Sequence, residues 1–397
     1  MKNLYLCLLL LVTLPSFAME FGLDRLNEPA IIEKLEGKNL AVLTHAAARN
    51  KKGEHLIDIL FHSYKLKKIF APEHGLRTME DDFIADVIDE ATGLPVISLY
   101  KSSSKSLSPA DLIGIDAIVI DLQDVGVRYY TYFSTIAAIM KTCAPLGIEV
   151  VLLDRPNLLG GKIIEGQVLD PALAGKFTSY HTVPTRHGMT LGELALMINA
   201  EKKMDVKLSV IAATGWVREN LLFNLDRPWL APSPALIELP QVGLYAIWGT
   251  LESINLAVGR GLTNELAFKV IGAPWMTTEQ SIKLAFDLNQ LGFKGVEFTP
   301  FSWTVTRAKY VGKVANGVKL KWDGTEVRTD EFTYKVSSLL IKLFPDQIGT
   351  DQFAVASFGS LRMVNAIRQG VPWDNYKTII DAELTAFRLR RALFLLY

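Results

Sequence analysis

Residues 117–154, AIVIDLQDVGVRYYTYFSTIAAIMKTCAPLGIEVVLLD, contain two short apolar runs on either side of a segment with helical periodicity. The runs at residues 117–121 and 149–154 are largely β-branched or aliphatic, which is typical of buried strands. Residues 131–146 carry apolar side chains at the spacing of an amphipathic helix. Two buried strands joined through a helix predict a parallel pair, which is the repeating unit of an open α/β sheet.

The residues before this unit continue the same alternation. Strand-like runs occupy residues 39–44, 66–70 and 95–100, and residues 55–64 have helical periodicity. The sequence therefore predicts an α/β fold with an open, mostly parallel sheet. In such sheets ligands bind beyond the carboxyl ends of the strands.

Polar clusters follow three of the predicted strands, at residues 72–77, 121–128 and 154–157. Asp, Asn, Pro and Gly in these clusters also form turns and helix caps, so one cluster alone is weak evidence for a site. Because the carboxyl ends of parallel strands share one edge of the sheet, three clusters together predict an active site there.

Composition excludes several classes of protein. The chain has 397 residues, 49% of them hydrophobic, and its 42 basic residues balance its 42 acidic ones. A chain without excess positive charge is a poor candidate for binding nucleic acid, and so many apolar residues predict a large core. The length predicts two domains.

Residues 1–18 are predicted to be a secretory signal peptide. Lys2 supplies a positive charge, residues 4–14 are almost wholly apolar, and Ser16 and Ala18 place small residues before a cleavage site at Met19. The apolar run is too short to span a bilayer comfortably. We expect an exported protein, periplasmic or secreted, with no membrane association after cleavage. The oligomeric state stays open.

Cofactor and metal motifs are not found. The sequence has no Gly-x-Gly-x-x-Gly after a strand and no phosphate-binding loop, so no nucleotide cofactor is predicted. His74 and His187 could combine with Glu73 and Asp124 into a metal site, but no His-Glu-x-x-His spacing occurs. No metal is therefore predicted, although a metal-dependent hydrolase stays open as an alternative.

Short motifs spread in order from about residue 22 to the C-terminus resemble the exo-β-N-acetylmuramidase family. They are Pro72-Glu73-His74-Gly75-Leu76-Arg77, Asp121-x-Gln123-Asp124-Val125-Gly126-Val127-Arg128-Tyr129-Tyr130-Thr131-Tyr132, Leu153-Asp154-Arg155-Pro156-Asn157, Glu165-Gly166, His187-Gly188-Met189-Thr190-x-Gly192-Glu193, Pro232-Ser233-Pro234, Gly259-Arg260-Gly261 and Gly272-Ala273-Pro274-Trp275.

The resemblance implies a Rossmann-like open parallel sheet domain, which we expect at residues 19–265, followed by a smaller α+β domain at 266–397 that completes the cleft. It also implies hydrolysis of the β-1,4 bond after a non-reducing terminal N-acetylmuramic acid in peptide-free peptidoglycan fragments, during cell-wall turnover or recycling. Peptidoglycan-derived sugar is then the expected partner.

Departures from the family pattern gather in the second half. Ala235 replaces an Asn, Ser253 and Ile254 replace a Gly-Thr pair, Ala257 and Val258 replace a Ser-Glu pair, and Leu262 replaces a Thr. Because a carboxylate is lost at Val258, a non-catalytic or weakened sugar-binding relative is the competing hypothesis.

A glycosidase needs one carboxylic acid to protonate the leaving oxygen and a second carboxylate to stabilise the transition state or activate water. Glu73 is the first candidate, because it follows a buried strand directly into the predicted cleft. Glu252 and Glu165 follow, in the loop-rich regions that the resemblance places near the sugar, and Asp121 and Asp124 are further carboxylates in the matching motifs.

Muramic acid differs from its neighbour sugar by a lactyl carboxylate, which arginine binds with directional donors. Arg128, Arg186 and Arg260 are the candidates, although each could instead pair with a buried aspartate. Tyr130 and Tyr132 could stack on the sugar or pack in the core. The predicted substrate-binding residues are His74, Arg77, Asp121, Asp124, Arg128, Tyr132, Asn157, His187, Asn255 and Arg260.

Overall fold

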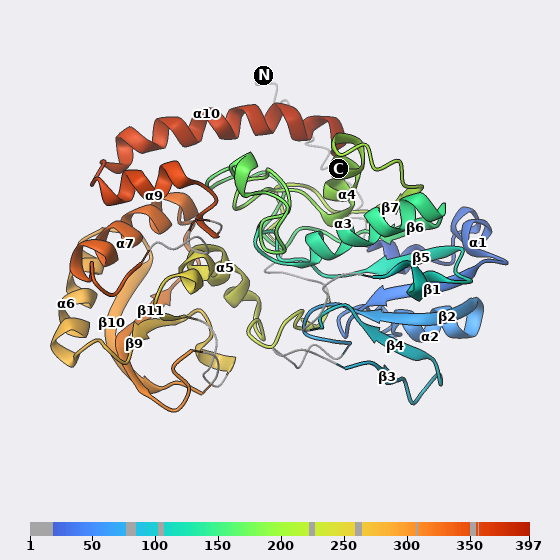
Figure 1. Cartoon of the computed structure of the whole chain (residues 1–397), viewed down its shortest axis with the longest axis horizontal. Helices are drawn as coiled ribbons and strands as arrows, with labels where there is room; N and C mark the ends of the chain where they lie inside the picture. Colours follow the sequence, from blue (N-terminus) through green and yellow to red (C-terminus); the bar gives the residue numbers. More distant parts are fainter. Residues whose placement is uncertain are drawn as a thin grey trace, which may run out of the picture.

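The computed structural model describes residues 19–76, 85–101, 107–221, 227–258, 264–306, 309–349, 355 and 357–397. These residues form two units, each with its own sheet (Figure 1). The predicted signal peptide, residues 1–18, lies outside them. Among the helices described, none is both long and apolar enough to cross a membrane.

The first unit contains a sheet with the strand order β3-β4-β2-β1-β5-β6-β7. Every neighbouring pair is parallel except β3 and β4. Its strands and helices are β1 (Asn39–Thr44), β2 (Lys65–Ala71), β3 (Val87–Ile88), β4 (Pro95–Ser98), β5 (Ala117–Asp121), β6 (Glu149–Leu153), β7 (Leu208–Ile211), α1 (Pro29–Leu35), α2 (Leu56–Ser63), α3 (Tyr132–Cys143) and α4 (Leu191–Glu201).

The α/β prediction is confirmed, and β1 and β5 begin and end at the predicted residues. Numbered along the chain without β3, the parallel strands have the order 3-2-1-4-5-6, as in doubly wound nucleotide-binding sheets. The strand order reverses at β1 and β5, and ligands bind beyond the carboxyl ends of the strands at such a point.

Helices cover both faces of this sheet because successive side chains of a strand point to opposite sides. Leu40 and Val42 of β1 pack into one buried cluster with residues of α1 and α2. Ala41 and Leu43 belong to a second cluster, which contains α3 and α4 and continues into the second unit. The same core therefore holds the two units together.

The second unit has a four-stranded antiparallel sheet of order β10-β11-β9-β8. Its elements are α5 (Leu239–Trp248), β8 (Ala257–Val258), β9 (Val270–Ala273), α6 (Thr278–Asn289), β10 (Val296–Thr304), β11 (Val314–Trp322), α7 (Thr329–Leu343), α9 (Leu361–Arg368) and α10 (Trp373–Arg391). A smaller second sheet with helices agrees with the predicted fold class. The boundary at residue 265 stays a prediction, although β8 lies before it and pairs with β9 of the second sheet.

Helix α10 carries the chain from the second unit back to the first (Figure 1). The hydroxyl of the terminal Tyr397 donates to Asp154 Oδ2 at 2.8 Å and accepts from the Ala213 amide at 2.8 Å. Arg391 donates to the carbonyl oxygen of Gly188 at 2.6 Å. The C-terminus is thus bound beside the end of β6, which fixes the second unit against the first.

Candidate active site

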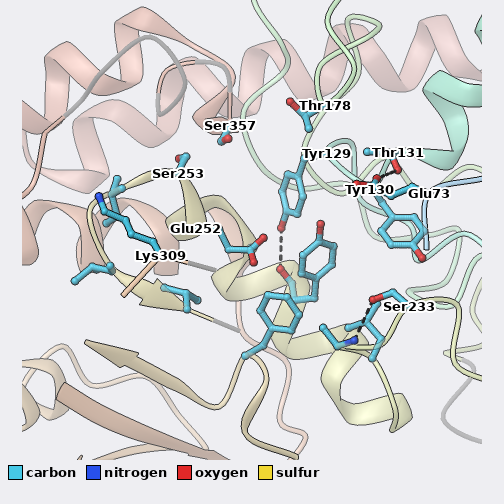
Figure 2. A pocket seen from close by; sticks show the side chains of 18 of the residues that line it. Glu73, Tyr129, Tyr130, Thr131, Thr178, Ser233, Glu252, Ser253, Lys309 and Ser357 are labelled. Atoms are coloured by element: carbon cyan, nitrogen blue, oxygen red, sulfur yellow. Dashed lines mark hydrogen bonds between the residues drawn. The ribbon is translucent and has the colours of Figure 1, made fainter. Parts of the chain in front are cut away.

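A cavity of about 490 Å³ lies between the two units, at the carboxyl edge of the first sheet. The first unit contributes the residues after β2, β4 and β5. The second unit contributes residues 252–258 and Lys309. Figure 2 shows the side chains of most of the residues that line it. The volume is within the range of about 300–1,000 Å³ that is common for small-molecule sites.

Glu73 enters the cavity from the turn that follows β2. Its neighbour His74 has a φ of 71°, in the left-handed region that residues other than glycine seldom adopt, and such strain is common at functional sites. The Glu73 side chain is 8% exposed, and the Thr131 hydroxyl donates a hydrogen bond to its Oε2 atom. Thr131 is the N-cap residue of α3, so Glu73 lies at the N-terminus of that helix.

Glu252 comes from the opposite unit, on the short 3-10 helix η6 (Gly249–Ser253), and is half-buried. In Figure 2, Glu252 and Glu73 lie on opposite sides of Tyr129. The Tyr129 hydroxyl donates to the carbonyl oxygen of Tyr245 at 2.8 Å, and the two rings pack edge to face with centroids 5.1 Å apart. The structure therefore places two glutamates and a fixed aromatic surface around one cavity.

Four of the predicted site residues line this cavity: Glu73, His74, Glu252 and Asn255. Asn255 donates through Nδ2 to the carbonyl oxygen of Gln347 at 2.9 Å, which fixes the orientation of its amide. Arg77 and Arg260 lie outside the described residues.

Glu165 is not among the residues that line the cavity. Its Oε2 atom accepts hydrogen bonds from the Thr329 amide at 3.1 Å and the Thr329 hydroxyl at 3.0 Å, at the start of α7. Arg186, a predicted carboxylate-binding residue, lies 3.7 Å from the same oxygen. Burial raises the pKa of Glu165, and Arg186 opposes that shift. Glu165 and Arg186 thus connect the two units away from the cavity.

Two predicted binding residues hold loops of the first unit. Asn157 accepts from the Leu159 amide at 2.8 Å and donates to the carbonyl oxygen of Met189 at 2.9 Å. His187 accepts from the Met189 amide at 3.1 Å through Nδ1, and burial lowers its pKa to about 3. Neither side chain lines the cavity.

Asp121 is fully buried and binds Arg155 with both carboxylate oxygens, one of them at 2.9 Å from Nη2. Tyr132 is also fully buried, and its hydroxyl donates to the carbonyl oxygen of Pro232 at 2.7 Å. Arg128 donates to the carbonyl oxygen of Ser357 at 2.9 Å, so it lies behind a residue of the cavity wall. The structure does not place any of the three in the cavity lining.

Several lining residues were not among the predicted site residues. Tyr129 and Thr131 lie inside the motif at residues 121–132, so that motif was a signal that could have identified them as site residues. Lys309 and Ser357 reach the cavity only through the fold of the second unit. No local motif in the sequence marks these two.

The departures from the family pattern are concentrated in this cavity. All five that fall on described residues line it: Ala235, Ser253, Ile254, Ala257 and Val258. Leu262 lies outside the described residues. The wall that the second unit contributes is therefore more apolar than the family pattern predicts.

Asp124, the remaining predicted residue, is buried and accepts a hydrogen bond from the Gly126 amide at 2.7 Å. Burial raises its pKa from 3.8 to about 7. Between these two values the folded state holds a proton that the unfolded state has released, so stability falls as pH rises through this window.

We expect Asp124→Asn to weaken that pH dependence, because the Asn side chain stays neutral and still offers Oδ1 to Gly126. The free energy of unfolding in urea, measured at about pH 4 and about pH 7, should fall less with pH in the variant than in the wild type. Burial also raises the pKa of Asp154, to about 6, but Asp154 adds the same pH dependence of stability to the wild type and to the variant. If the free energy of unfolding fell equally with pH in the wild type and in Asp124→Asn, the raised pKa of Asp124 would be contradicted.

Two glutamates around an aromatic-lined cavity, at the carboxyl edge of a parallel sheet, are typical of an α/β enzyme that acts on a carbohydrate. Family models described as exo-beta-N-acetylmuramidase NamZ match the chain, the N-terminal one at residues 40–240 and the C-terminal one at 243–397. The chain belongs to the exo-β-N-acetylmuramidase NamZ family, which confirms the resemblance found in the sequence.

Individual relatives agree with this assignment. The chain is 34% identical to the peptidoglycan beta-N-acetylmuramidase NamZ of Bacillus subtilis (strain 168), over 96% of this chain and 91% of that protein. Two crystal structures of DUF1343 family proteins from Bacteroides fragilis NCTC 9343 are also similar. One has a TM-score of 0.82 at 29% identity, and the other 0.74 at 26%. Each comparison covers 96% of this chain and 99% of the solved chain.

Proposed function

We propose that this protein is an exo-acting glycoside hydrolase that releases N-acetylmuramic acid from the non-reducing end of peptide-free peptidoglycan fragments. The observation that carries the proposal is the pair Glu73 and Glu252, which line one cavity from opposite units. Membership of the family over both halves of the chain, and similarity to the peptidoglycan beta-N-acetylmuramidase of Bacillus subtilis, support the same reaction.

The two glutamates supply the carboxyl groups that glycoside hydrolysis requires. One protonates the oxygen of the leaving sugar while the other stabilises the oxocarbenium-like transition state or activates water. Thr131 holds Glu73 in place through its hydroxyl, and the edge-to-face pair of Tyr129 and Tyr245 offers a rigid surface for a sugar ring. We assign Glu165 no role in this chemistry, because it does not line the cavity.

We also propose that the protein is exported. The proposal rests on the charge and apolar pattern of residues 1–18. A substrate derived from the cell wall is consistent with a periplasmic or secreted enzyme.

A second candidate function is a sugar-binding relative with weakened chemistry. The observation that favours it is the position of the departures, because Ala235, Ile254 and Val258 all line the cavity. Glu73 and Glu252 are retained, however, and so the structure favours the enzyme.

Hydrolysis of a chromogenic substrate distinguishes the two candidate functions. Residues 19–397 are expected to hydrolyse a chromogenic β-N-acetylmuraminide and to leave the matching glucosaminide nearly untouched, with rates unchanged after prolonged EDTA treatment. Absence of hydrolysis combined with retained binding of N-acetylmuramic acid would favour the sugar-binding relative.

Loss of activity in EDTA, with recovery on adding a divalent metal, would support the metal-dependent alternative. Among the described residues no cluster of three or more His, Cys, Asp and Glu side chains could hold a metal ion.

A further inference from the structure

Lys309 brings a positive charge to the wall that the second unit contributes. It lies between β10 and β11, and it is the sole lysine or arginine among the described residues that line the cavity. Figure 2 shows it on the same side of the cavity as Glu252 and Ser253, away from Glu73. A cation at this position would contact the sugar at some distance from Glu73.

Neutral groups hold the Lys309 side chain. Its ammonium group donates to Asn255 Oδ1, which also accepts from the Tyr310 hydroxyl. The ammonium nitrogen also lies 5.2 Å from the centroid of the Tyr310 ring. Because Asn255 is itself fixed by Gln347, the lysine is anchored through a side chain with a fixed orientation.

In the part of the chain that the structure describes, no carboxylate forms an ion pair with Lys309, which is exposed at the cavity. An ammonium group has three N–H donors, and Asn255 accepts from one of them. The remaining donors are available to an anionic group in the cavity.

The wall that the second unit contributes is largely apolar, and its one acidic residue among the described lining residues is Glu252. Val258, Ile254 and Leu256 make this part of the lining apolar. A lactyl ether has an apolar methyl group next to a carboxylate, which matches an apolar wall with one cation. Three arginines were predicted for this role. Arg128 donates to the carbonyl oxygen of Ser357, Arg186 lies beside Glu165, and neither lines the cavity. Arg260 lies outside the described residues.

We propose that Lys309, held by Asn255, binds the lactyl carboxylate of the muramic acid unit and determines selectivity for the free acid. This inference rests on the proposed function. It predicts that a substrate whose lactyl carboxylate is converted to a neutral amide, as in peptide-bearing fragments, loses the interaction with the ammonium group.

The test combines two substrates with four proteins. The substrates are a chromogenic β-N-acetylmuraminide with a free lactyl carboxylate and its lactyl carboxamide. The proteins are the wild type, Lys309→Met, Lys309→Arg and the control Lys319→Met, whose lysine is exposed on β11 over the Phe301 ring. Melting temperatures of the variants check that each is folded.

The wild type should prefer the acid over the amide by about 10- to 100-fold in kcat/KM, the range of a hydrogen bond between charged groups. Lys309→Met should reduce this preference to a few-fold, chiefly by raising KM for the acid. Lys309→Arg should retain most of it, and Lys319→Met should match the wild type.

Three outcomes separate the proposals. If the wild type hydrolyses acid and amide equally, the function stands and the role of Lys309 is refuted. The role is also refuted if folded Lys309→Met keeps the full preference. If the wild type hydrolyses neither substrate, the proposed function fails, and binding of N-acetylmuramic acid to wild type and Lys309→Met then decides the inference, which requires weaker binding in the variant.

Discussion

Replacement of Glu73 by Gln is expected to lower kcat on a β-N-acetylmuraminide by about 10²- to 10⁴-fold, the usual contribution of a general acid or base. Gln preserves the size of the side chain and can still accept the hydrogen bond from Thr131. It cannot donate an acidic proton, and it carries no negative charge towards the developing oxocarbenium ion. We therefore expect KM and the melting temperature to change little, with the loss confined to kcat.

The matched control is Glu165→Gln. Glu165 is another buried glutamate of the first unit, but it binds Thr329 rather than lining the cavity. Its variant should keep kcat within a few-fold of the wild type, with any loss appearing in stability. The assignment would be overturned if Glu165→Gln lost the activity and Glu73→Gln kept it.

The second large effect is expected in stability, at the buried pair of Asp121 and Arg155. Both side chains are at most 5% exposed, and Arg155 donates to both carboxylate oxygens of Asp121. The Arg155 guanidinium also lies 4.8 Å from the centroid of the Phe21 ring. Removing one partner from such a pair leaves an uncompensated buried charge, so Arg155→Ala should cost about 3–5 kcal/mol of unfolding free energy.

Urea unfolding of Arg155→Ala and of the double variant Arg155→Met with Asp121→Leu measures this effect. The double variant should recover part of the loss, because it removes both charges and keeps apolar volume. Arg362→Ala serves as the surface control, since the Arg362 and Glu383 pair is largely exposed on the arginine side. An equally small loss in Arg155→Ala and Arg362→Ala would contradict the structural role of the buried pair.

Most of the first sheet could be predicted from the sequence, because buried parallel strands are short, apolar and separated by helical periodicity. The spacing of Thr190 and Glu193 is likewise typical of a capping box, and in the structure Thr190 accepts from the Glu193 amide while Glu193 accepts from the Thr190 amide. Both features depend on residues close together in the chain, which is where a sequence pattern carries most information.

The candidate site was predictable only in part. Polar residues at strand ends either line the cavity or hydrogen bond to neighbouring backbone, and the sequence pattern is the same in both cases. Glu73 and Asn157 both follow parallel strands, yet Glu73 lines the cavity while Asn157 hydrogen bonds to neighbouring backbone. Lys309 is distant from the first unit in sequence and carries no local motif. Which side chains reach the cavity depends on how the second unit packs against the first.

The most direct test of the proposed reaction is the product analysis of a peptide-free glycan chain that begins with N-acetylmuramic acid at its non-reducing end. Residues 19–397 and the Glu73→Gln variant are incubated with it in parallel, and the products are followed over time by mass spectrometry. The wild type should release free N-acetylmuramic acid first and leave a chain shorter by one sugar, while Glu73→Gln leaves the substrate intact. Internal fragments from the wild type, or the same products at the same rate from Glu73→Gln, would contradict the account.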